Sequence, residues 1–146
     1  MQTARLLAPS DRNILGKLSQ ALWAMAIAAA VAVLTNVGGV YLGDASLEPV
    51  MAELHRRRAV VFIHPTSPAC WECTSLGFPR PMIEFPFDTT RAVTNMLLSG
   101  TLARYPDIRW IVPHAGGALP FLASRIAGIS ASNMEPPQPG TMCMPR

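Results

Sequence analysis

The chain has 146 residues, 50% hydrophobic and 14% charged, with a formal net charge of +3, which is enough apolar sequence for one domain with a buried core. The basic residues are scattered apart from residues 56–58, and no aromatic side chains alternate with them to stack on bases, which argues against nucleic-acid binding. Three cysteines give no disulfide framework, so we expect a reducing, cytoplasmic location.

The N-terminal part divides into a polar lead and an apolar stretch. Residues 1–17 lack hydrophobic periodicity, so we expect a poorly ordered lead. Residues 21–34 are all apolar, but this stretch is shorter than the about 18 residues that a membrane-spanning helix needs. Its alanines favour a helix over residues 18–30, and residues 31–35 then favour a buried strand. A small protein anchored in a membrane by residues 21–34 remains an alternative.

A helix and a second strand follow the glycine pair at residues 38–39. The expected helix has apolar residues at the spacing of one buried face: Leu47, Val50, Met51 and Leu54. Its candidate N-cap is Asp44 or Ser46. The apolar run at residues 59–63 predicts a second strand that ends at His64.

The segment from residue 64 to about residue 87 is rich in proline and too long for a simple connector. We interpret it as a functional or disordered loop. Cys70 and Cys73 lie in it as a C-x-x-C pair, but no second pair completes a zinc site, so we do not expect one here. Trp71 and Phe78 are either ring contacts for an aromatic substrate or simple loop packing.

A third helix follows this loop. Residues 88–90, Asp-Thr-Thr, have the composition of a helix cap, and Gly100 marks the stop. Its apolar face carries Val93, Met96 and Leu97. Capping and a surface ion pair are the simplest roles for its first charged residues, which are Glu84, Asp88 and Arg91.

The last expected elements are a strand at residues 108–112, which leads to His114, and a helix at residues 119–129. The Pro-rich tail at residues 130–146 has no pattern that could pack, and we expect it to be disordered. Strand and helix thus alternate three times, which predicts an α/β fold with a parallel sheet and right-handed crossovers. A complete (β/α)₈ barrel takes about 250 residues. We therefore expect residues 18–129 to form a partial TIM barrel, with about three parallel strands that cannot close.

His64 and His114 each follow an apolar strand, and the carboxyl ends of neighbouring parallel strands meet at one edge of a sheet. An imidazole at that edge either binds a metal or transfers a proton, or it is a hydrogen-bonded packing residue. Residues 115–120 lead directly into a helix, so free backbone N–H groups at the start of that helix could bind an anion. The glycines at 116 and 117 could equally serve tight packing alone.

Several motifs occur in one order along the chain: residues 34–36, 41–44, 61–65 (VFIHP), 83–91 (IEFPFDTTR) and 113–121 (PHAGGALPF). Together they resemble the amidohydrolase-related decarboxylases, a group that includes aminocarboxymuconate-semialdehyde decarboxylase and the fungal 6-methylsalicylate decarboxylases. The resemblance runs from about residue 31 to residue 129.

The resemblance implies a TIM barrel with a divalent metal, usually zinc, at the carboxyl ends of its strands, and no organic cofactor. His64 matches a metal ligand, and His114 matches a histidine that assists proton transfer. Arg125 matches an arginine that reaches into a neighbouring subunit's site to hold the substrate carboxylate, which implies a homo-oligomer. The implied reaction is the non-oxidative decarboxylation of a small aromatic carboxylic acid such as 6-methylsalicylate.

Two parts of the family's metal site have no match. The chain contains no His-x-His pair, and the Pro-rich tail stands where the metal-binding aspartate is expected. We therefore expect a truncated member that binds zinc weakly and has little or no activity alone. The alternative is a non-catalytic protein whose exposed sheet edges pair with a full-length relative.

Overall fold

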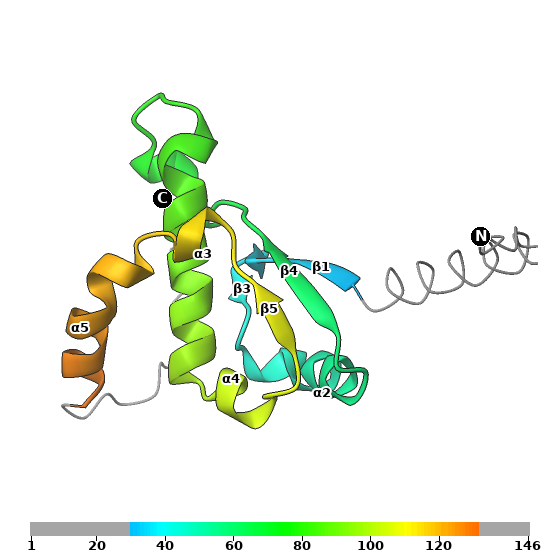
Figure 1. Ribbon diagram of the computed structural model, residues 1–146. Helices are drawn as coiled ribbons and strands as arrows, with labels where there is room; N and C mark the ends of the chain where they lie inside the picture. The colour runs from blue at the N-terminus through cyan, green and yellow to red at the C-terminus, as the bar shows by residue number, and fades with distance from the viewer. Residues whose placement is uncertain (1–29, 132–146) are drawn as a thin grey trace, which may run out of the picture.

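The structure is a computed structural model that describes residues 30–131, and these form a parallel sheet packed against helices (Figure 1). The predicted lead at residues 1–17, the predicted helix over residues 18–29 and residues 132–146 of the predicted tail lie outside the described residues. Ala30, the last residue of that predicted helix, belongs to the first strand instead.

The three predicted strands and their parallel arrangement are confirmed. They are β1 (Ala30–Leu34), β4 (Val60–His64) and β5 (Arg109–Ile111), in the spatial order β1-β4-β5. Leu34 pairs with His64, and Phe62 pairs with Ile111. The carboxyl ends of the three strands therefore lie along one edge of the sheet.

A short antiparallel hairpin follows β1. Its strands are β2 (Asn36–Val37) and β3 (Val40–Tyr41), and the turn between them uses Gly38 and Gly39, both with positive φ. The hairpin returns the chain past the end of β1, where it brings Tyr41 close to Asn36.

Helices connect the strands. The first crossover contains the 3-10 helix η1 (Ala45–Leu47) and α2 (Glu48–Arg56), and the second contains η2 (Trp71–Thr74), α3 (Arg80–Leu98) and α4 (Thr101–Arg104). Asp44 caps η1 through a bond from the Ser46 N–H, so the predicted cap begins the 3-10 helix rather than α2. Gly100, at φ 76°, ends α3 as predicted.

The core lies on one face of the sheet. Val61 and Ile63 of β4 are fully buried there, and they belong to one cluster with residues of α2 and α3: Met51, Leu54, Ala92, Val93 and Met96. The alternate residues of the strands point to the other face, where Leu34, Phe62 and Ile111 are 44%, 39% and 50% exposed. Helices within the described residues thus cover only one side of the sheet.

Three predicted burials are wrong. The strand predicted at residues 31–35 was expected to be buried, but β1 (Ala30–Leu34) is largely exposed because it is an edge strand with one uncovered face. Val50 and Leu97 were placed on buried helix faces, but they are 49% and 50% exposed because they lie at the margins of those faces.

The predicted loop from residue 64 to residue 87 is too long, because α3 already begins at Arg80. Pro81 lies in the first turn, where a missing N–H removes no helical hydrogen bond. Pro86 lies inside the helix and does remove one, but the first turns of α3 are exposed, so water can bond the freed carbonyl. The prolines therefore suggested a loop in a segment that is the start of a helix.

The described part of the chain ends with η3 (His114–Gly116) and α5 (Leu119–Ser130). The bounds of α5 are close to those of the helix predicted at residues 119–129. In Figure 1, α3 stands between α5 and the sheet. No side chain of α5 is fully buried, and Phe121 is 91% exposed. Within residues 30–131, no helix combines the length and the apolar content that crossing a membrane would need.

Candidate active site at the carboxyl edge of the sheet

The two predicted histidines come from neighbouring strands at the same edge. His64 is the last residue of β4. The last pair of β4 with β5 is Phe62 with Ile111, and continuing this register by two residues places His64 opposite residue 113, one position before His114. Both side chains belong to exposed residues. The structure therefore brings these two residues to one edge of the sheet.

His64 presents one ring nitrogen to the outside. Its Nδ1 lies 2.9 Å from the carbonyl oxygen of Pro65. A carbonyl can only accept, so Nδ1 carries the hydrogen and the neutral ring keeps its lone pair on Nε2. Metal-binding histidines commonly donate their second N–H to such an oxygen, so this orientation suits a metal ligand.

His114 lies in a strained turn. Its φ is 53° and that of Ala115 is 51°, both in the left-handed region that non-glycine residues rarely adopt. Its Nδ1 is 3.4 Å from Thr89 Oγ1. Strain of this kind persists only where surrounding contacts hold it, and it concentrates at functional sites.

Three N–H groups of the turn before α5 are already bonded within the described residues. Gly116 N–H donates to Pro113 O, Gly117 N–H to His114 O, and Ala118 N–H to Thr90 Oγ1. Two of these bonds lie within the left-handed turn, and the third joins the turn to α3. These three groups are therefore not free to bind an anion.

Packing explains the second glycine of this turn. A Cβ on Gly117 would lie 2.3 Å from Pro86 O and 2.6 Å from Thr90 Oγ1, closer than real Cβ contacts allow. The turn after β5 thus needs glycine here to reach the surface of α3.

Asp88 was predicted to cap a helix or to form a surface ion pair, but it is fully buried inside α3. Its carboxylate accepts hydrogen bonds from four side chains: Thr35, Asn36 (2.9 Å), Tyr41 (2.5 Å) and Thr66 (3.1 Å). The sequence pattern misled because Asp-Thr-Thr after a proline is a typical capping composition. The helical spacing of residues 85, 88, 92 and 96 was the available signal for a buried face.

Three of the four partners of Asp88 lie just beyond the ends of β1 and β4. Thr35 and Asn36 follow β1, and Thr66 lies two residues beyond His64. Thr66 N–H also donates to Thr35 Oγ1 at 3.0 Å. One buried carboxylate therefore ties the end of β1 to the loop that follows His64.

Tyr41 is the aromatic member of this network. Burial, together with the hydrogen bond to Asp88 and its negative charge, raises the pKa of Tyr41 above its usual value. The phenol thus stays protonated and remains a donor to the carboxylate over the physiological range.

Three consecutive residues of α3 hold three different parts of this edge. Asp88 holds the ends of β1 and β4, Thr89 contacts His114, and Thr90 Oγ1 accepts the N–H of Ala118 at 2.8 Å. All three are buried. We call residues 88–90 the α3 anchor.

Arg125 is not brought to this edge by its own chain. It is exposed on α5, and it lines an apolar groove between α3 and α5 with Thr94, Leu98, Leu122, Ile126 and Ile129. A role of Arg125 in the same site would therefore require a second copy of the chain.

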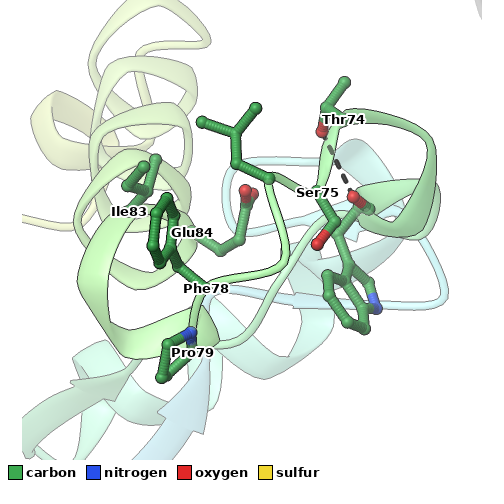
Figure 2. Close-up of a pocket in the computed structure, with 8 residues that line it drawn as sticks. Thr74, Ser75, Phe78, Pro79, Ile83 and Glu84 are labelled. Carbon is green, nitrogen blue, oxygen red and sulfur yellow. Dashed lines mark hydrogen bonds between the residues drawn. The ribbon is translucent and has the colours of Figure 1, made fainter.

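Trp71 and Phe78 line one small pocket at the start of α3. Figure 2 shows it, with Phe78, Ile83 and Glu84 on one side and Thr74 and Ser75 on the other. The Arg80 guanidinium carbon lies 4.7 Å from the centre of the Trp71 ring. The C-x-x-C pair lies beside this pocket: Cys70 directly precedes η2 and is half-buried, and Cys73 lies in η2 and is exposed.

Three kinds of comparison with known proteins agree on the family to which this chain is related. The amidohydrolase family model Amidohydro_2 matches residues 20–129. A 6-methylsalicylic acid decarboxylase of Penicillium expansum is 44% identical over 105 residues, which is 72% of this chain and 31% of that protein. A 2-amino-3-carboxymuconate-6-semialdehyde decarboxylase of Dictyostelium discoideum is 33% identical over 97 residues, 63% of this chain and 26% of that protein.

Solved structures agree. A crystal structure of an amidohydrolase II has a TM-score of 0.67 at 38% identity, covering 71% of this chain and 34% of the other. The Metarhizium anisopliae IDCase in apo form has a TM-score of 0.60 at 29% identity, covering 82% of this chain and 34% of that one. The chain spans about a third of the length of these relatives.

The fold and its edge site define an α/β protein with part of a TIM barrel, in which three parallel strands do not close. The chain belongs to the amidohydrolase family, and its named relatives include decarboxylases.

Proposed function

We propose that this chain carries the middle portion of a decarboxylase active site for a small aromatic carboxylic acid such as 6-methylsalicylic acid. The observation that carries the proposal is the pair His64 and His114, which lie at the ends of neighbouring strands at one edge of the sheet. The named activities of the relatives support the substrate class.

In this proposal His114 supplies a proton. The exposed ring takes a proton from water at Nε2 and passes it to the ring carbon that bears the carboxylate, where a π electron pair of the aromatic ring forms the new C–H bond. The bond from that carbon to the carboxylate then breaks, its electron pair restores the aromatic ring, and CO₂ leaves. The hydroxide left by the water combines with the released CO₂ as hydrogencarbonate. The reaction needs neither an oxidant nor a reductant.

Arg125 binds the substrate carboxylate in this proposal, because a guanidinium matches the geometry of a carboxylate. Since Arg125 lies on α5, with α3 between that helix and the sheet, it serves the site of a second copy. The proposed active form is therefore a homo-oligomer.

Metal chemistry is only partly supported by the donors present. His64 has the orientation of a metal ligand, and zinc is the ion that such a site would hold. However, residues 30–131 contain no group of three or more His, Cys, Asp or Glu side chains that could hold a metal ion. The described residues do not form a complete metal site.

The test uses the full chain and its three histidines. We expect 6-methylsalicylate to shift the imidazole NMR signals of His64 and His114. The matched control is His55, which lies on α2 away from the edge and should not move. Equal shifts at all three rings, or none, would contradict the proposed site.

The same preparation is analysed for zinc and for CO₂ release. We expect less than one zinc per chain and little turnover, because the described residues form no complete metal site. Stoichiometric zinc with turnover that His64→Ala abolishes would overturn this expectation and show a complete enzyme.

A further inference from the structure

We propose that Thr89 is a positioning residue that holds His114 in a single tautomer, with the hydrogen on Nδ1 and the lone pair on Nε2. This inference deepens the proposed function, since it names the residue that aims the proton-transfer group. It concerns the free protein, so it can be tested without substrate.

The hydrogen count at Thr89 carries the proposal. Its hydroxyl has one hydrogen, and its Oγ1 lies 2.9 Å from Phe85 O but 3.4 Å from His114 Nδ1. The carbonyl can only accept, so the hydroxyl hydrogen points to the shorter contact. Oγ1 then offers only lone pairs to the imidazole, and Nδ1 must be the donor.

Burial makes this choice matter. Thr89 is 0% exposed, so water cannot reorganise around its hydroxyl as it could at the surface. The other tautomer would set the Nδ1 lone pair against those of Oγ1, which is unfavourable because no water reaches the Thr89 hydroxyl to separate them.

The backbone keeps the ring in place. His114 and Ala115 hold positive φ angles, and the turn is fixed on α3 by the bond from Ala118 N–H to Thr90 Oγ1 at 2.8 Å. Thr89 and Thr90 are neighbours, so the residue that orients the ring and the residue that holds its turn belong to the same helical turn. The contacts of these two neighbouring threonines thus hold the strained backbone of His114 in place.

His64 reaches the same tautomer by a different contact. Its Nδ1–H donates to Pro65 O, which also leaves Nε2 with the lone pair. Both histidines at the edge therefore offer the same ring atom.

The test reads the tautomer of His114 by long-range ¹H–¹⁵N NMR of the full chain, at a pH where the ring is neutral. We expect a pyrrole-like Nδ1 and a pyridine-like Nε2. Thr89→Val removes the acceptor and should convert His114 to a mixture of tautomers, whereas Thr89→Ser restores the hydroxyl and should restore the single tautomer.

Thr94→Val is the matched control. Thr94 lies on the same helix, and its buried Oγ1 has no hydrogen-bond partner within the described residues, so this change should leave His114 as it is. His64 serves as an internal measure of folding, because its own neighbour fixes its tautomer. Global unfolding would disturb both rings, and a positioning effect would disturb His114 alone.

An Nε2–H tautomer or a mixture in the unmodified chain would overturn the proposal, as would a Thr89→Val variant with His114 unchanged. Neither result depends on substrate binding. A chain that fails to bind 6-methylsalicylate but shows the single tautomer would refute the proposed function and leave the role of Thr89 intact.

Discussion

The two faces of the central sheet differ sharply, although the same strands build both. Ile63 faces α2 and α3 and is 0% exposed, whereas Ile111 on the neighbouring strand faces away from the helices and is 50% exposed. In a complete TIM barrel the second face is the interior, which side chains from other strands fill. The comparison shows that the helices cover one face of the sheet only. The stability of the described region therefore comes from the packing on that face.

The largest expected effect compares these two isoleucines. We expect Ile63→Ala to lower the free energy of unfolding by about 2–5 kcal/mol, because it opens a cavity in the core. Ile111→Ala, the same chemical change on the uncovered face, should cost less than about 1 kcal/mol. Urea unfolding of both variants measures the difference.

An equal cost for the two changes would break the comparison. It would mean that another segment or another molecule covers the second face in solution. Repeating the measurement at several protein concentrations separates these cases, since only association makes the cost depend on concentration.

The second prediction concerns Asp88, at the edge of the sheet where the carboxyl ends of the strands lie. Asp88→Asn keeps the shape of the side chain but removes the charge and turns one acceptor atom into a donor, facing four donors. We expect a loss of about 2 kcal/mol, again by urea unfolding. The matched change Asp107→Asn, at a side chain that is 51% exposed, should stay within about 0.5 kcal/mol.

The third and smallest effect is a pH dependence at Tyr41. Because burial and Asp88 raise its pKa, folding stability from this phenol is fully present below the unfolded pKa of about 10 and is lost as the pH rises through the higher folded value. Tyr105→Phe leaves Tyr41 as the only tyrosine, so tyrosinate absorbance then reports this group alone.

Within that background, Asp88→Asn should lower the pKa of Tyr41, because the opposing negative charge is gone. A titration midpoint that does not move would show that burial alone sets the value and that the contact with Asp88 is weak in solution.

The sequence predicted the strands well because a short apolar run that ends in a loop is a local signal. Residues 59–63 and 108–112 contain that signal, and so they placed His64 and His114 at strand ends correctly. Parallel order followed from the alternation of strands and helices. These features need no knowledge of distant contacts.

The role of Asp88 could not be predicted in this way. Its partners lie 22 to 53 residues away, and nothing in the local pattern distinguishes a capping aspartate from a buried one. The same is true of Thr89, whose contact with His114 depends on how the turn after β5 packs on α3. The prolines at 79, 81 and 86 then concealed the helix that carries both residues.

The α3 anchor has a consequence for how this region can change. Each residue of a helix is rotated by about 100° from the one before it. Inserting or deleting a single residue between Pro86 and Asp88 would swing all three anchor side chains off their targets at once. Substitutions can be absorbed one contact at a time, whereas a shift in helical phase disconnects the whole edge, so homologous sequences should align across this stretch without gaps.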